Sequence, residues 1–317
     1  MGNKVIHLMH VPFTGLGLYN GFRGNRWLKN RVKIFKQFVI PSLQSQTSKN
    51  FVLWCAFRYE EKSNPIVKEL QEYMRGITEF KTVFTFNGIC FWDDKYSDIE
   101  ARSRLISSLH GSIGELLDTI GEVDSVLMTI QPSDDIYVRD FIERIQKMFE
   151  NKPNIQGIGF TKGYIMNYQS KEIKRYNPKT NPPFYTVKFP RDIFTDPLKH
   201  VEYTSLKKDV GIYKKGTPCP SHEYIGDCIN YATIDERGFL VGCHGENVST
   251  HFNHPYGEGS LDEEVLYNFG IYGVKPLKIR YSLRKRILRL FPYKVQRKIR
   301  YIFGESIWKR VYEFLRS

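Results

Sequence analysis

The chain has 317 residues, 41% of them hydrophobic and 15% aromatic, so it can bury a sizeable core and is not a disordered chain. This length fits about two average domains, or one large α/β domain with an appendage. Its five cysteines are widely spread and form no C-x-x-C pair, which favours reduced thiols over a disulfide framework or a zinc knuckle. No apolar run approaches the roughly 20 residues that span a bilayer, and the N-terminus lacks a signal-peptide pattern, so we expect a cytoplasmic protein.

The net charge of +13 is concentrated at one end of the chain. Residues 275–317 contain 14 Lys and Arg against 2 Asp and Glu, which gives this tail a charge of +12 and leaves +1 for the other 274 residues. A nearly neutral body followed by a basic tail predicts a folded domain at residues 1–274 and a separate basic segment at residues 275–317.

Up to residue 160, the apolar pattern alternates between strands and helices. The expected elements are strands 5–11, 51–57, 82–86, 125–129 and 154–160, and helices 27–40 (ended by Pro41), 66–74, 99–120 and 140–149. This alternation predicts an α/β fold with a mostly parallel central sheet flanked by helices. Beyond it, short strand-like pieces alternate with loops rich in Pro, Gly, Asn and His, which we expect to carry specificity. The pieces span residues 163–168, 185–189 and 238–243.

Two adjacent carboxylates, Asp134 and Asp135, follow the expected strand 125–129 after a turn at Pro132 and Ser133. In open α/β sheets, ligands bind outside the carboxyl ends of the strands. Two hard oxygen ligands at such a place suit Mg²⁺ or Mn²⁺ held against a diphosphate. An acidic pair after a strand also occurs as the cap of the next helix, so the pair alone leaves both interpretations open.

Other polar residues stand near the expected ends of elements. The loop at residues 14–24 is rich in glycine but lacks the G-x-G-x-x-G fingerprint, and it begins at Thr14, which we expect to reach a ligand. Arg102 and Arg104, near the start of helix 99–120, are placed to face a phosphate. The alternative is that both are ordinary solvated arginines.

Two later stretches hold further candidate residues. Residues 220–228 contain His222, Glu223 and Asp227, which are candidates for a general base, although His222 and Glu223 also fit a helix cap. Residues 243–254 contain three histidines without the spacing of a zinc site. One of these could complete a magnesium or manganese site, and a plain hydrogen-bonding role fits equally well.

Six segments, in the same order along the chain, carry a resemblance to a known family. They are Arg31-Val-Lys-Ile-Phe35, Ile40-Pro-Ser-Leu-Gln-Ser-Gln-Thr47, Asn50-Phe-Val-Leu-Trp54, Thr129-Ile-Gln-Pro-Ser-Asp-Asp135, Asn181-Pro-Pro-Phe184 and His244-Gly-Glu-Asn247. The set resembles glycosyltransferases with the GT-A fold, and among them the rhamnosyltransferase-like family. The resemblance covers roughly residues 5–254.

The resemblance implies a Rossmann-like GT-A fold, a nucleotide-sugar donor and a divalent metal, Mn²⁺ or Mg²⁺. Pro132 stands where the family has its first aspartate, so Asp134 would bind the metal. Asp135 would be a second ligand or would accept a hydrogen bond from a sugar hydroxyl. His244 is the expected late metal ligand. The end of the second strand carries Arg58 where such enzymes often place an acidic residue, and only two glutamates follow.

We assign roles to the candidate residues on this basis. The expected donor-contact residues are Thr14, Arg31, Arg102, Arg104, Asp134 and Asp135. An inverting transfer needs a group that takes the proton from the acceptor hydroxyl. Asp227 and Glu223 are the first choices for this base, and His222 is the third.

The basic tail has apolar residues at three- and four-residue steps, broken at Pro292 and Gly304, with mostly Lys and Arg between them. This pattern predicts short basic amphipathic helices, which are typical of a peripheral anchor on an anionic membrane surface. We therefore expect the chain on the cytoplasmic face of a membrane. The alternative is that the apolar face packs on the body and the cations are solvated.

Three functions fit these features. The leading one is a glycosyltransferase in surface polysaccharide synthesis, which moves a sugar from a nucleotide-sugar donor to a glycan or lipid-linked acceptor. The second is a metal-dependent nucleotidyltransferase or nuclease that uses Asp134 and Asp135. The third is a nucleic-acid-binding protein that uses the tail, and it is disfavoured because the body has no known binding motif and no evident basic stripe. The sequence lacks a P-loop and a G-x-S-x-G elbow.

Overall fold

The computed structural model describes most of the chain before the basic tail. The described residues are 4–14, 24–88, 98–203, 225–245, 252 and 258–279, with the backbone alone at 98, 99, 101, 102 and 201. The chain divides into two units, Met1–Leu277 and Lys278–Ser317. The first unit is described below. The predicted boundary after residue 274 and the predicted tail helices stay predictions, since the tail lies almost wholly outside the described residues.

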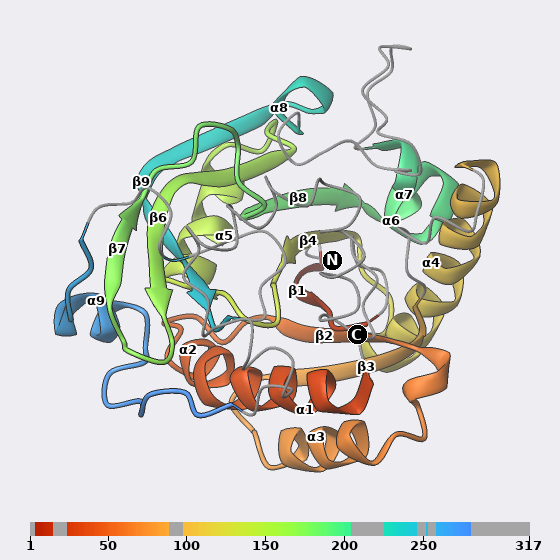
Figure 1. The fold of residues 1–317 in the computed structure, drawn as a ribbon. Coiled ribbons are helices and arrows are strands. Elements are labelled where there is room, and N and C mark those ends of the chain that lie inside the picture. The colour runs from red at the N-terminus through yellow and green to blue at the C-terminus, as the bar shows by residue number, and fades with distance from the viewer. Residues whose placement is uncertain are drawn as a thin grey trace, which may run out of the picture. The chain divides into compact units, whose positions relative to one another are not determined.

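The first half of the sheet is parallel. Strands β1 (Val5–Pro12), β2 (Val52–Arg58), β3 (Lys81–Gly88) and β4 (Ser125–Ile130) lie in the order β3-β2-β1-β4 (Figure 1). Six of the seven residues of β2 are buried, as expected for a parallel strand covered by helices on both faces. These four strands confirm the parallel arrangement that the sequence predicts.

The second half of the sheet is mixed. Strand β8 (Tyr185–Pro190) pairs antiparallel with both β4 and β6 (Gly157–Asn167), and β6 pairs parallel with β9 (Tyr231–Cys243). The short strands β5 (Ile136–Tyr137) and β7 (Ile173–Tyr176) pair antiparallel with β9 and β6. The full order is β3-β2-β1-β4-β8-β6-β9-β5, with β7 beside β6.

Helix α4 (Asp98–Ile120) covers one face of the sheet, with the short helices α6 (Arg191–Thr195), α7 (Pro197–Tyr203) and α8 (Ile225–Cys228) on the same side. The apolar residues of α4 recur every three or four positions and pack against side chains of β1 to β4 and β8. Each such buried side chain contributes about 1.5–3 kcal/mol relative to an exposed one. The buried residues of α4 are Leu105, Leu109, Ile113 and Leu116.

The opposite face carries α1 (Gly24–Ile34), a π-helical turn η1 (Phe35–Val39), α2 (Ile40–Gln44) and α3 (Pro65–Arg75), as the lower part of Figure 1 shows. The prediction that Pro41 ends this helix is wrong. Proline at the first turn of α2 loses no helical hydrogen bond, and the wider π-helical turn before it makes room for the ring.

One further prediction is corrected by the register of the strands. The expected strands 154–160 and 163–168 are one continuous strand, β6, because β9 runs beside it from Gly157 to Asn167 with shifts near Lys162. In the sheet, β8 lies between β4 and β6. The predicted α/β class is nevertheless confirmed, with helices on both faces of a largely parallel sheet.

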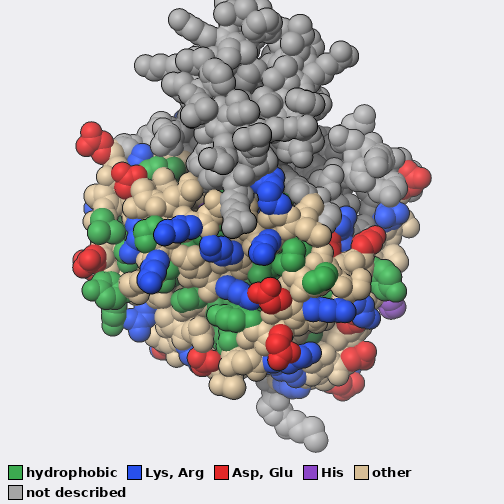
Figure 2. Space-filling model, turned by 60° about the horizontal axis from the view of Figure 1, so that its bottom comes forward, with side chains coloured by type: hydrophobic (Ala, Val, Ile, Leu, Met, Phe, Trp, Pro, Cys, Tyr) green, Lys and Arg blue, Asp and Glu red, His purple; other side chains and the backbone are tan. Residues whose placement is uncertain are grey.

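The surface over α1 is basic. Arg26, Lys29 and Lys33 are exposed at steps of three and four residues, and Figure 2, which looks onto the side of α1 and α3, shows Lys and Arg side chains gathered there. The expectation that the body carries no basic stripe stays a prediction, because three exposed cations on one helix do not decide it. Among the described helices, none combines the length and the apolar character that a bilayer crossing requires.

Candidate functional site

The candidate site lies at the carboxyl ends of β1 and β4, where the order of the sheet reverses. Strands β2 and β3 lie on one side of β1, and β4 lies on the other. In α/β sheets this reversal opens a crevice outside the strand ends, and ligands bind there. Thr14 follows β1, and Asp134 and Asp135 follow β4, so the structure places these three residues at the two strand ends beside the reversal.

Three segments that are distant in sequence meet at Asp134. Arg31, from α1, forms an ion pair through Nη1 with Asp134 Oδ2. His244, which follows β9, places Nε2 3.0 Å from the same oxygen. The side chain of His244 is 1% exposed, and that of Asp134 is 15% exposed. A buried carboxylate oxygen is thus shared by a guanidinium and an imidazole.

The two neighbouring carboxyl groups have opposite pKa shifts. Burial by itself would raise the pKa of Asp134, but the charge of Arg31 and the hydrogen bond from His244 outweigh it and hold the pKa well below its usual value. For Asp135, burial and the nearby Asp134 charge raise the pKa well above its usual value. The environment therefore favours the ionised form of Asp134 and disfavours that of Asp135.

The backbone of β9 lies close to the turn at residues 132–135, which we call the acidic turn. The N–H of Gly242 donates to Asp135 Oδ1 at 2.9 Å. A Cβ added at Gly242 would lie 2.2 Å from the carbonyl oxygen of Asp134 and 2.4 Å from Cε2 of Tyr168. Residue 242 must therefore be glycine for β9 to approach the turn this closely.

Tyr168 and Gln131 also hold the turn, through its backbone carbonyls. The Tyr168 hydroxyl donates to the Asp134 carbonyl at 2.8 Å, and its ring stacks on Phe38 with centroids 3.8 Å apart. Gln131 Nε2 donates to the carbonyls of Pro132 and Asp135, at 2.8 and 2.7 Å. Tyr168 and Gln131 are both buried. The turn is thus held by hydrogen bonds to its backbone as well as by the contacts of its two carboxylates.

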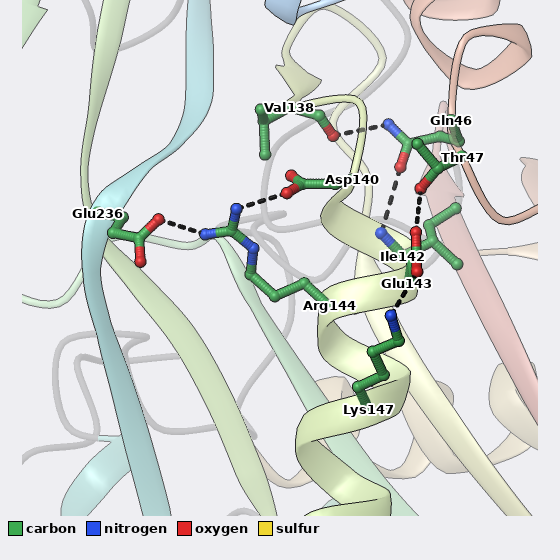
Figure 3. A network of polar contacts seen from close by, with 9 residues as sticks. All are labelled: Gln46, Thr47, Val138, Asp140, Ile142, Glu143, Arg144, Lys147 and Glu236. Carbon is green, nitrogen blue, oxygen red and sulfur yellow. Dashed lines mark hydrogen bonds and ion pairs between the residues drawn. The ribbon is translucent and has the colours of Figure 1, made fainter.

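The segment that resembles the Pro-Ser-Leu-x-x-Gln-Thr motif holds the chain just after this turn (Figure 3). Gln46 Nε2 donates to Val138 O at 2.9 Å, and its Oε1 accepts the N–H of Ile142 at 3.2 Å. Thr47 Oγ1 donates to Glu143 Oε2 at 2.7 Å. These bonds satisfy an N–H in the first turn of α5 (Phe141–Asn151). The motif residues therefore position the acidic turn by anchoring the helix that follows it.

Thr14 takes part in a second polar cluster, at the end of β2. Its hydroxyl donates to Glu61 Oε2 and accepts the N–H of Arg58 at 3.2 Å. Glu61 also accepts from Arg58 Nη2 at 2.6 Å and is 2% exposed. An acidic residue therefore stands at the end of β2, and its carboxylate joins the loop after β1 to the turn after β2.

The remaining predicted site residues lie away from Asp134 or outside the described residues. Arg104 is exposed on α4 and lines a surface pocket with Ser108 at the end of β3, so it is not joined to the Asp134 cluster by any contact described. The side chain of Arg102 is not described, and His222 and Glu223 lie outside the described residues. Asp227 is exposed on α8. Their predicted roles stay predictions.

The predicted metal ligands do not form a metal site as they lie. Asp134 Oδ2 is shared by Arg31 and His244, and Asp135 Oδ1 accepts a backbone N–H. Within the described part of the chain, no group of three or more His, Cys, Asp or Glu side chains is arranged to hold a metal. The predicted Mn²⁺ or Mg²⁺ stays a prediction, and no chemical step below depends on it.

Four residues of the site were not predicted as such from the sequence: Gly242, Tyr168, Gln131 and Glu61. Gly242 had a readable signal, because a glycine within a strand pattern often marks a close backbone approach. Glu61 was noted only as following the second strand. The roles of Tyr168 and Gln131 depend on contacts across the sheet, which no local pattern reveals.

Comparison with known proteins gives distant structural neighbours. No family model and no curated protein matches the chain. The crystal structure of S. aureus TarS is 12% identical, covering 77% of this chain and 37% of TarS, with a TM-score of 0.33. A protein described as a nucleotide-diphospho-sugar transferase, from Desulfovibrio desulfuricans G20, is 11% identical, covering 77% of this chain and 84% of that one, with a TM-score of 0.36. This chain thus spans just over a third of TarS, and at these scores neither neighbour decides its function.

Proposed function

We propose that this chain is a GT-A glycosyltransferase that takes a nucleotide-sugar donor and transfers the sugar to a glycan or lipid-linked acceptor in surface polysaccharide synthesis. The observation that carries the proposal is the junction of Arg31, Asp134 and His244 at the reversal point of the sheet. The six ordered sequence segments support it. We further propose that the sugar of the donor is rhamnose.

The reaction needs two kinds of group. The leaving nucleoside diphosphate gains negative charge as the glycosidic bond breaks, so positive and hydrogen-bond-donating groups must face it. The acceptor hydroxyl must lose its proton to a base as the new bond forms. We assign the first task to the Asp134 cluster. For the second we propose Asp227, Glu223 or His222.

A panel of nucleotide-sugars, scored by release of nucleoside diphosphate, tests the function with the full chain. We expect turnover with one donor class, and a loss of at least about tenfold for Asp134→Asn, because that change removes the charge that holds Arg31. Asp118→Asn is the matched control, since Asp118 is an exposed carboxylate on α4. If no donor is consumed and none binds, the proposal is wrong.

Two further measurements separate the alternatives. Single alanine substitutions of Asp227, Glu223 and His222 should leave one variant nearly inactive, and three active variants would rule out this assignment of the base. Thermal stabilisation by UDP or dTDP, but not by nucleoside triphosphates or DNA, supports a transferase of sugars. The reverse result would favour a nucleotidyltransferase or nuclease.

We also propose that the chain contacts an anionic membrane surface through residues 275–317. The exposed cations of α1, Arg26, Lys29 and Lys33, are consistent with an anionic partner of the first unit as well. Sedimentation with anionic liposomes should be lost when the chain is truncated before Lys275. Equal sedimentation of the truncated chain would refute the role of the tail.

A further inference from the structure

The Asp134 carboxylate already holds a permanent cation. Arg31 pairs with Oδ2 of Asp134, and the same oxygen lies 3.0 Å from His244 Nε2. Asp135 is turned away to the backbone N–H of Gly242, at 2.9 Å. A divalent ion at Asp134 would therefore have to stand beside a guanidinium, and like charges repel strongly in a buried site. This arrangement disagrees with the metal that the resemblance implies.

Arg31 keeps hydrogen-bonding capacity after it has formed this pair. Its side chain is 8% exposed, and its cation lies 5.4 Å from the ring centroid of Trp27. Its Nε–H is buried and has no hydrogen-bond partner among the described residues. A guanidinium carries five N–H donors and suits phosphate oxygens in pairs. A buried N–H without a partner at a strand-end crevice therefore indicates a place for an acceptor atom of a ligand.

The surroundings of Arg31 favour an anionic ligand. Residues 1–59 contain nine Lys and Arg and no Asp or Glu. This segment supplies β1, α1 and β2, so the cations of the site's first segments are not offset by acidic residues of their own. The ion pair with Asp134 is neutral as a unit, and the basic segment around it provides the remaining attraction for a doubly charged diphosphate.

We propose that Arg31, rather than a divalent metal, faces the diphosphate of the donor, so that nucleoside diphosphate binding and sugar transfer need no metal ion. This inference rests on the function proposed above. During transfer the bond between the sugar carbon and the diphosphate oxygen breaks, and its electron pair stays on that oxygen, where the N–H groups of Arg31 stabilise it. The acceptor oxygen bonds to the sugar carbon, and its proton passes to the base. Asp134 and His244 act as positioning residues, because they hold the guanidinium in place.

Calorimetry with UDP and dTDP tests the inference on the full chain, once after treatment with EDTA and once with added Mn²⁺ or Mg²⁺. We expect the same affinity in both conditions. Arg31→Gln should weaken binding about tenfold or more, the usual effect of losing a charge-assisted hydrogen bond. Lys68→Gln is the matched control, because it removes one exposed cation from α3, outside residues 1–59, and should leave binding nearly unchanged.

A second variant separates binding from folding. Arg31→Gln leaves Asp134 buried without its cation and is expected to lower stability, whereas Arg31→Gln/Asp134→Asn leaves a neutral pair. The double variant should fold and still bind the nucleotides weakly. If it binds as tightly as the unchanged chain, Arg31 does not face the diphosphate.

The EDTA comparison uses the unchanged chain and decides whether binding needs a metal ion, whatever the variants do. Binding that appears only with Mn²⁺ or Mg²⁺ would overturn this inference and leave the proposed function standing. Binding of neither UDP nor dTDP, with or without metal, would overturn the proposed function and this inference with it.

Discussion

Replacing Gly242 by alanine tests how closely β9 must approach the acidic turn. The new Cβ would lie 2.2 Å from the Asp134 carbonyl oxygen, so the two segments must separate by about 0.8 Å to reach the 3.0 Å that real Cβ contacts keep. The obstacle is a backbone atom, which cannot swing aside as the end of a flexible side chain can. The Tyr168 ring, 2.4 Å away, blocks a second direction. The substitution therefore opens the turn without removing a charged group.

We expect this opening to lower the free energy of unfolding by about 2–4 kcal/mol. Overpacking contributes about 1–3 kcal/mol, and the loss of the 2.9 Å bond from the residue 242 N–H to Asp135 contributes about 1 kcal/mol. Urea denaturation measures the change, and UDP or dTDP binding by the folded fraction reports the displaced Asp134. Gly114→Ala is the control, because nothing lies within 4 Å of its Cβ and a helical alanine gains about 0.5–1 kcal/mol. An alanine at position 242 that cost no stability would refute the reasoning.

Three further predictions concern buried groups of the first unit. Burial lowers the pKa of His7 and His10 to about 3 and that of His200 to about 4. The free energy of unfolding should therefore be highest above about pH 6.5 and fall towards about pH 4, by up to about 1.4 kcal/mol per pH unit for each histidine. Denaturation curves that do not change between about pH 7 and about pH 5 would contradict this. Both ring nitrogens of His10 are buried and have no hydrogen-bond partner in the part of the chain that the structure describes. His10→Phe, which keeps the ring contact with Trp54, should therefore raise the free energy of unfolding by up to about 1–3 kcal/mol, and a loss of that size would show that the imidazole has a partner in solution. Burial raises the pKa of the Cys55 thiol, so peptide mapping after maleimide treatment should find this cysteine labelled only in unfolded protein, and labelling in the native state would show that β2 opens.

The elements of the parallel half were predictable because each leaves a strong local signal. The run at 51–57 is apolar at nearly every position, as a strand buried on both faces must be, and the structure has β2 there. Helix α3 was predicted from Val67, Leu70 and Met74, which are all buried. Prediction from the sequence failed where the position of a strand in the sheet depends on the strands that pack beside it. Whether β8 pairs beside β4 or at an edge is decided by packing across the sheet, and its own sequence does not encode that choice.

The candidate site was predictable in part. Its acidic pair follows a strand, and the order of the family-like segments brought Arg31, Asp134 and His244 into one hypothesis. The sequence does not show that these three side chains meet at a single oxygen, because they are separated by more than 100 residues at each step. It also gives Asp134 and Asp135 the same chemistry. Only the three-dimensional arrangement separates them, because the charge of Arg31 lowers the pKa of Asp134, whereas burial and the Asp134 charge raise the pKa of Asp135.

The segment at residues 40–47 and the acidic turn act as one structural unit. Ser42 Oγ donates to the carbonyl of Tyr137, and Gln46 holds both Val138 and the start of α5. These bonds fix the chain directly after Asp135, while β4 and the buried Gln131 fix it directly before Asp134. Since α2 continues from α1 through the π-helical turn, the same helical segment that carries Arg31 also anchors the turn that carries its partner. A displacement of α2 would therefore move the guanidinium and the carboxylate together, so the ion pair should persist under changes that alter its position relative to β1.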